Sequence, residues 1–217
     1  MVLDDATLAR AKEEYDRQGF TLVKGFLRGE ALATIQREAV AYLADIAPTK
    51  PESEAFYIEQ GDVDTIVQTH EMYETDFWLQ LPWSDDWLQL ARACGGTDAL
   101  GPKSVGLKDG KRFCKSLELH QKGPGGKSVR SPPHQDNWYF NLVGGEVPTI
   151  WVAMERVDAE NGCLRYVPGT HTQPLRTHVL SELRGFSQMV DSWTEEDEAA
   201  AIPVVSAPPP RPLAPRR

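Results

Sequence analysis

The sequence has no hydrophobic stretch that could cross a membrane and no segment that resembles a secretory leader. Its 217 residues contain no run of about eighteen apolar residues, so we expect no transmembrane helix. The N-terminal stretch MVLDDATLARAKEEY carries acidic side chains where a signal peptide needs a basic region followed by an apolar one. We therefore predict a protein that is neither secreted nor membrane-embedded, and we assign it to the cytoplasm.

Cysteines and basic residues are both scarce. The three cysteines, Cys94, Cys114 and Cys163, are odd in number and widely spaced, which matches neither a zinc site nor a disulfide framework. This usage is typical of a reducing compartment. The net charge of −9 argues against nucleic acid or an anionic membrane as the partner. We expect a small-molecule substrate, and the sequence gives no indication of the oligomeric state.

The length and most of the composition predict one domain with a substantial core. Hydrophobic residues make up 41% of the chain and charged residues 25%, as in ordinary globular proteins. The exception is the final stretch SAPPPRPLAPRR, which is rich in proline and arginine and has no strand-forming run. We predict a domain over residues 1–205 and a disordered Pro/Arg-rich tail over residues 206–217.

Periodicity predicts the elements that precede the central motifs. Leu8, Ala11 and Tyr15 have helical spacing between a capping aspartate and Gly19, and a second helical pattern ends near Pro48. Polar residues 48–82 show few periodic signals and are predicted to be irregular. The full prediction is a helix ending at Gly19, a strand at 20–24, helices at 29–47 and 84–94, a loop at 97–111 and a strand at 112–121.

The most informative motif is His134-Gln135-Asp136. In an extended segment, side chains at positions i and i+2 project from the same face, so the His134 imidazole and the Asp136 carboxylate are expected to lie side by side. One imidazole and one carboxylate are two of the three ligands in the two-histidine, one-carboxylate arrangement that binds non-heme Fe(II). A solvated loop or a simple hydrogen-bonded His–Asp pair also fits this short motif.

The residues after this motif strengthen the metal-site interpretation. Residues 149–157 and 162–167 are predicted strands around a turn, and the segment Pro168-Gly169-Thr170-His171 follows. The order of HQD, WVAME, ENGCLRYV and PGTH resembles the phytanoyl-CoA dioxygenase family of Fe(II)/2-oxoglutarate oxygenases. The segment Lys122-Gly123-Pro124 and the opening YDRQGFTLVKGFL are also similar to that family. The resemblance extends over residues 8–205.

This resemblance implies a fold, a reaction and a set of site residues. The implied fold is mainly β with flanking helices, a cupin-like double-stranded β-helix or jelly roll. The implied reaction is hydroxylation of a small organic or acyl substrate with Fe(II) as cofactor and 2-oxoglutarate as cosubstrate. His134 and Asp136 would be the metal ligands and catalytic residues, Lys122 a contact for 2-oxoglutarate, and Trp138 a wall of the cofactor pocket.

Several side chains keep two interpretations at this point. Lys122 is equally compatible with a solvated loop, and Trp138 with core packing beside Tyr139 and Phe140. His120 either lines the barrel or faces solvent. The remaining candidates are His70, interpreted as a surface or hydrogen-bonded histidine, Trp151, interpreted as core, and Arg165, which is either a cavity-lining or a surface cation.

One part of the family pattern is missing from this sequence. The family has a second iron histidine on a later strand and, about ten residues beyond it, an arginine that pairs with 2-oxoglutarate; residues 206–217 stand where this segment would follow. His171 resembles a structural histidine of the family, so His171 or His178 would be a substitute ligand at best. We expect the chain to be a C-terminally truncated or misread dioxygenase that lacks its last strands, and a true short variant is the alternative.

The missing segment keeps two other functions open. The first is a catalytically inactive jelly-roll binding module, which would bind ligands without turnover. The second is a cupin-like metalloprotein that does not use 2-oxoglutarate, which would require another histidine or glutamate close to His134.

Overall fold

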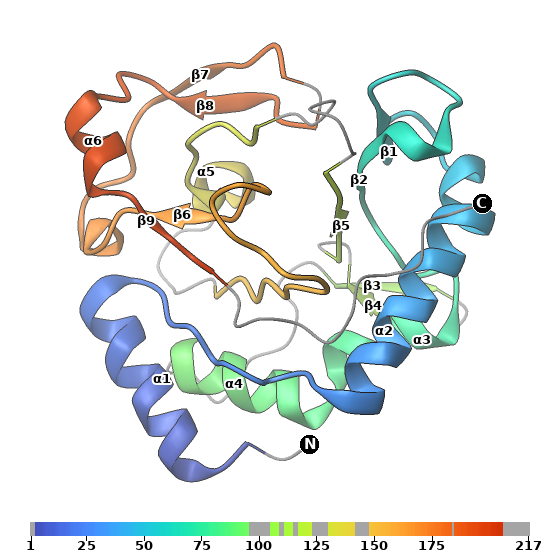
Figure 1. Ribbon diagram of the computed structural model, residues 1–217, viewed down its shortest axis with the longest axis horizontal. Helices are drawn as coiled ribbons and strands as arrows, with labels where there is room; N and C mark the ends of the chain where they lie inside the picture. The colour runs from blue at the N-terminus through green and yellow to red at the C-terminus, as the bar shows by residue number, and fades with distance from the viewer. Residues whose placement is uncertain are drawn as a thin grey trace.

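The structure is a computed structural model that describes residues 3–95, 105–108, 111–114, 117–122, 130–141, 148–183 and 185–205. These residues form helices separated by short strands (Figure 1). The helices are α1 (Asp5–Gln18), α2 (Gly29–Ala41), α3 (Asp76–Gln80), α4 (Asp85–Gly95), α5 (Asp136–Phe140) and α6 (Glu195–Ala200). The strands are β1 (Ala55–Tyr57), β2 (Ile66–Thr69), β3 (Val105–Lys108), β4 (Lys111–Cys114), β5 (Leu119–His120), β6 (Arg165–Tyr166), β7 (His178–Leu180), β8 (Gln188–Val190) and β9 (Ile202–Pro203). Among these residues, no helix has both the length and the apolar character to cross a membrane.

The strands pair in four small antiparallel sheets. One sheet has the order β1-β2-β5, and the pairs β3-β4, β6-β9 and β7-β8 make the other three. The fold prediction is therefore met in part, because the strands are short and the described residues do not assemble two large facing sheets. The tail predicted at 206–217 lies outside the described residues.

The first helix forms where the sequence predicts it. The Asp4 carboxylate accepts a hydrogen bond from the Thr7 backbone N–H and caps α1, and Gly19 ends the helix with φ +86°. Ala11 is buried, and α1 lies beside α4 at one end of the molecule (Figure 1). The helix predicted at 84–94 corresponds to α4, so these two helices are confirmed.

The second predicted helix keeps its length but changes its winding. After α2 the chain continues as a π-helix over Tyr42–Ile46 and a short 3-10 helix over Ala47–Thr49. Pro48 lies in the first turn of that 3-10 helix, where its missing N–H costs no hydrogen bond. Leu32, Ile35 and Ala39 form the buried face that the periodicity indicates.

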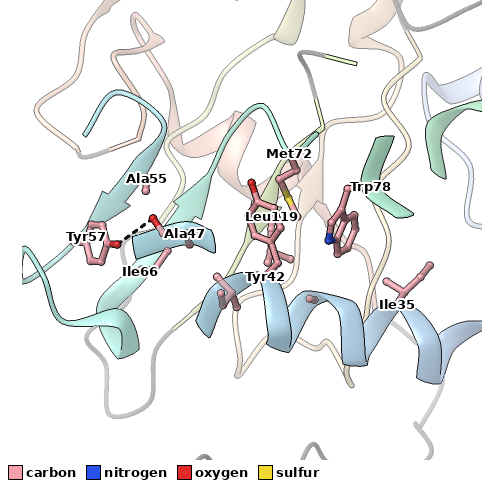
Figure 2. Close-up of a cluster of buried hydrophobic side chains, with 11 residues drawn as sticks. Ile35, Tyr42, Ala47, Ala55, Tyr57, Ile66, Met72, Trp78 and Leu119 are labelled. Atoms are coloured by element: carbon pink, nitrogen blue, oxygen red, sulfur yellow. Dashed lines mark hydrogen bonds between the residues drawn. The ribbon is translucent and has the colours of Figure 1, made fainter. Parts of the chain in front are cut away.

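The segment predicted to be irregular, residues 48–82, instead supplies much of the core. It contains β1, β2 and α3, and its side chains Ile66, Met72 and Trp78 pack against Tyr42 and Leu119 (Figure 2). The prediction was wrong because strands of three and four residues are too short to give a periodic signal.

Three other sequence predictions are corrected. Residues 20–24 form no strand, and the predicted loop at 97–111 contains β3, which pairs with β4. The predicted strand at 112–121 divides into β4 and β5, which belong to different sheets. Residues 149–157 lack regular structure, and the strand predicted at 162–167 is reduced to β6. Trp151, predicted to be core, is 37% exposed.

Candidate functional site

The structure brings His134 and Asp136 together. The Nε2 atom of His134 lies 3.3 Å from Oδ1 of Asp136, and both side chains are partly buried. Gln135, between them, has extended backbone angles of φ −121° and ψ 122°. This conformation places the neighbours of Gln135 on one side of the chain, as the sequence predicts.

Backbone and side-chain hydrogen bonds orient this pair. His134 donates Nδ1–H to the carbonyl of Pro132 at 2.8 Å, so Nε2 is the ring nitrogen turned toward Asp136. Metal-binding histidines are commonly oriented in this way, with the second ring nitrogen donating to a carbonyl or carboxylate. Burial alone would lower the pKa of His134, but its hydrogen bonds to Asp136 and Pro132 raise the pKa above the ordinary value.

Thr149 holds the other oxygen of the carboxylate. Its hydroxyl donates to Oδ2 of Asp136 at 2.7 Å, which leaves Oδ1 directed toward His134. Burial alone would raise the pKa of Asp136, but the hydrogen bonds from His134 and Thr149 lower it, so the carboxylate is ionised at neutral pH. Sequence reasoning missed Thr149, because this threonine follows the motif by thirteen positions and comes from a segment without regular structure.

The central residue of the motif is anchored by the segment around β7. The backbone N–H of Gln135 donates to Nε2 of His178 at 3.1 Å, and the Gln135 side-chain oxygen accepts from the backbone N–H of Arg176 at 2.8 Å. His178 is 7% exposed and donates Nδ1–H to the Arg176 carbonyl. Both ring nitrogens of His178 are therefore occupied, so this histidine positions the motif and does not offer a ligand atom.

Trp138 lies beside that anchor and away from the paired side chains. The helix α5 begins at Asp136, so the chain is not extended beyond the motif and Trp138 does not share a face with Asp136. The Trp138 ring stacks on His178 with centroids 4.6 Å apart, and its indole N–H donates to the Gln188 side chain. A large, open cavity lies beside His134, and Trp138 is not among the described residues that line it.

Lys122 lines that cavity, and its side chain lies against Gly162 in the turn before β6. Its Nζ would lie 2.8 Å from a Cβ built on Gly162, whose φ is +88°. This close approach and the positive φ both favour glycine at position 162. Burial lowers the pKa of Lys122. The turn itself was predicted correctly, since Asp158 accepts from the backbone N–H groups of Glu160 and Asn161.

His171 has a structural role. It donates Nε2–H to the Asp16 carbonyl at 3.0 Å, and its ring lies against Gly19 at the end of α1. The close approach of this ring leaves no room for a side chain at position 19. His171 therefore attaches the PGTH segment to the first helix, as its resemblance to a structural family histidine indicated.

His134 and Asp136 fit two positions of a mononuclear metal site, but the third position is not provided by the described part of the chain. Within that part, no group of three His, Cys, Asp or Glu side chains has a metal-binding arrangement. Of the substitutes considered from the sequence, His171 uses its Nε2 and His178 uses both ring nitrogens for backbone hydrogen bonds. The donor set thus fits Fe(II) incompletely.

Three of the arginines that line the cavity are paired with carboxylates of α6. Arg130 and Arg165 both contact the Glu198 carboxylate, and Arg176 lies 3.1 Å from Asp197. A capping box formed by Thr194 and Asp197 begins this helix. Arg165 lines the cavity and is also exposed, so both interpretations of this residue hold in part.

A second polar group lies on one face of the β1-β2-β5 sheet. Gln68 pairs with His120 across β2 and β5, and Oε2 of Glu118 lies 2.9 Å from Gln68 Nε2, 3.1 Å from His120 Nε2 and 3.7 Å from His70 Nε2. We call these four residues the Glu118 face. His120 is 37% exposed and lines the cavity, so both interpretations of this residue hold in part. The alternation in VQTH and LELH could have revealed this face.

Comparisons with known proteins agree with the motifs. A sequence model of the family described as phytanoyl-CoA dioxygenase (PhyH) matches residues 15–208. A protein named dioxygenase lolE1 from Epichloe uncinata is 31% identical over 195 residues, which cover 87% of this chain and 68% of that protein.

Animal relatives match over shorter stretches. The peroxisomal phytanoyl-CoA dioxygenase of Bos taurus is 42% identical over 62 residues, which are 28% of this chain and 18% of the bovine protein. The rat protein of the same name is 44% identical over the same length. The chain thus spans less than a fifth of these two relatives. The family has a cupin-like jelly-roll fold, which supports the predicted fold class. On the family match and the lolE1 similarity, the chain belongs to the phytanoyl-CoA dioxygenase family.

Proposed function

We propose that the protein is an Fe(II)/2-oxoglutarate-dependent dioxygenase that hydroxylates a small organic or acyl substrate. The observation that carries this proposal is the oriented pair of His134 Nε2 and Asp136 Oδ1, 3.3 Å apart, in a chain of this family. Bound iron would supply activation of O2, and 2-oxoglutarate would supply the two electrons that the hydroxylation needs.

The residues of this chain would bind and orient these groups. His134 and Asp136 would hold the metal, and Thr149 would keep the second carboxylate oxygen turned away. His178 would fix the backbone between the two ligands, with Trp138 supporting its ring.

We assign the carboxylate of 2-oxoglutarate to Lys122. It lines the cavity, and no carboxylate of the described residues forms a salt bridge with it, whereas Arg130, Arg165 and Arg176 are paired with α6. Lys122→Met should raise the Kd for 2-oxoglutarate by about tenfold, because one charge-assisted hydrogen bond is lost. Lys24→Met, at the end of the segment after α1, is a matched control that should leave this Kd unchanged.

The deciding experiment measures succinate release from 2-oxoglutarate. The full chain is loaded with Fe(II) under argon and then exposed to O2, with His134→Ala as the inactive reference. We expect O2-dependent succinate above that reference. Metal binding without succinate release would instead favour the second candidate, a binding module, which is suggested by the absence of a third ligand among the described residues. Fe(II) binding with metal-dependent chemistry that ignores 2-oxoglutarate would indicate a cupin-like metalloprotein.

A further inference from the structure

Two buried polar atoms of the Glu118 face have no hydrogen-bond partner among the described residues. Gln68 is 4% exposed, and its Nε2 donates to Glu118 while its Oε1 has no hydrogen-bond partner. Nε2 of His70 is also buried without a hydrogen-bond partner. Each such orphan costs about 1–3 kcal/mol, so two of them on the same face favour a bound group here.

Glu118 gives this face a negative charge. Burial alone would raise the pKa of Glu118, but the hydrogen bond from His120 lowers it, so the carboxylate is ionised at neutral pH. Burial lowers the pKa of His70, which keeps that imidazole neutral. All hydrogen bonds that described residues make to the carboxylate reach Oε2, so Oε1 is the oxygen open to a ligand.

Aromatic rings lie against the histidines of this face. Phe56 lies 5.0 Å from the His70 ring, measured between centroids. Phe186 lies between the two polar groups, with its centroid 6.3 Å from that of His120 and 5.6 Å from that of His134. A carboxylate beside aromatic rings favours an organic cation, through ion pairing and cation–π attraction.

The Glu118 face belongs to the same cavity as the His134–Asp136 pair. Both groups line one continuous space, and Glu118 contributes to the pKa of His134 as His120 does to that of Asp136. A group bound at Glu118 would therefore place its neighbouring carbon atoms past Phe186, close to the paired ligands. The net charge of −9 would also attract cations to the protein.

We propose that the Glu118 face binds the ammonium group of an amine substrate, with Glu118 as the ion-pair partner and Phe186 as the ring beside it. This inference rests on the proposed function, because it names the substrate class of the same cavity. An ammonium site at Glu118 disfavours substrates that would place a carboxylate or phosphate there, because two anions would then lie a short distance apart.

Binding can be measured without metal or turnover. Chelator-treated full chain is titrated by calorimetry with n-hexylammonium, 1-hexanol and hexanoate, which share a six-carbon chain and differ in charge. We expect hexylammonium to bind at least about tenfold more tightly than hexanol, and hexanoate to bind most weakly. Glu118→Gln, which keeps the shape and removes the charge, should abolish the preference, and Glu13→Gln on α1 should retain it.

A second variant keeps the test informative if Glu118→Gln fails to fold. Phe186→Leu retains an apolar side chain and leaves Glu118 in place, and it should weaken hexylammonium about threefold while leaving hexanol unchanged. Equal binding of the three probes, or a preference that survives in Glu118→Gln, would overturn the inference. Succinate release distinguishes the two proposals: release without amine preference contradicts only the substrate class, and amine preference without release contradicts only the dioxygenase reaction.

Discussion

The first half of the described chain, residues 3–119, and the second half, residues 130–205, are stabilised by different kinds of interaction. Of the buried hydrophobic residues in the described part of the chain, only Val190 and Ala201 follow Leu119. Most of the large exposed hydrophobic side chains, including Tyr139, Trp151 and Leu180, lie in the second half. The first half therefore has a hydrophobic core, whereas the half that carries His134 and Asp136 depends more on directed hydrogen bonds.

The first half thus contributes mainly to stability, and the second half carries the candidate site. In the first half, Tyr42 packs among apolar side chains and donates to Glu74, which pairs with Lys50 at 2.6 Å. In the second half, His178 and Thr149 each fix one part of the HQD motif through a single hydrogen bond. Substitutions in the two halves should thus have different signatures, and the following experiments test this division.

The largest effect is expected on metal affinity. His134→Ala removes one of two ligand atoms and should lower Mn(II) affinity by at least about 100-fold, because removing even a supporting residue of a metal site costs about 10–100-fold. Titrations followed by electron paramagnetic resonance measure this change. His171→Ala, which loses contacts with Asp16 and Gly19 but none with the HQD pair, is the control and should keep the affinity within a factor of about two. Equal losses in both variants would contradict the assignment.

A core substitution should affect stability alone. Ile66 is 1% exposed, so Ile66→Ala should lower the free energy of unfolding by about 3 kcal/mol. Leu180→Ala, at a position that is 85% exposed, should change it by less than about 0.5 kcal/mol. Urea unfolding measures both. The division between the halves would fail if Leu180 proved as costly as Ile66.

Substitution of His178, which anchors Gln135, should moderately lower both stability and metal affinity. His178→Phe preserves a ring for Trp138 but leaves the Gln135 N–H without its acceptor, so we expect a loss of about 1–3 kcal/mol. Metal affinity should fall about tenfold as the motif loosens. His178→Gln restores an acceptor oxygen and should recover part of both losses. Unchanged metal affinity in His178→Phe would show that the anchor does not position the ligands.

The smallest effect is a dependence of stability on pH through Glu118. Its pKa in the folded protein lies below 4.5, so its stabilising contribution is present above that pH and is lost as the pH falls through the folded pKa. The contribution should be less than about 1 kcal/mol, because the side chain is 33% exposed. Chemical unfolding at pH 6, 4 and 3 should show a shallower acid loss for Glu118→Gln than for the unchanged protein. Parallel curves would refute the ion-pair network.

The fold was predictable where a signal is local. The N-cap at Asp4, the stop at Gly19 and the apolar spacing of α2 all follow from short-range hydrogen bonding and side-chain periodicity. The strands β1 and β2 were missed because three and four residues are too short to give a periodic signal, and β2 also depends on pairing with β5 some fifty positions later. The predicted strand at 149–157 failed for the related reason that an apolar run does not itself supply a pairing strand.

The sequence by itself determined the family, the HQD pair and the charge of the chain, since these depend on residue identity and on spacing of one or two positions. Only the tertiary structure decided that Thr149 holds Asp136, that Trp138 turns to His178, and that Gln68 meets Glu118. The last two contacts join residues forty or fifty positions apart, and the first joins α5 to a segment without regular structure. Local alternation can mark a polar face, but it does not say which segments meet, because these contacts arise only when separate elements pack together.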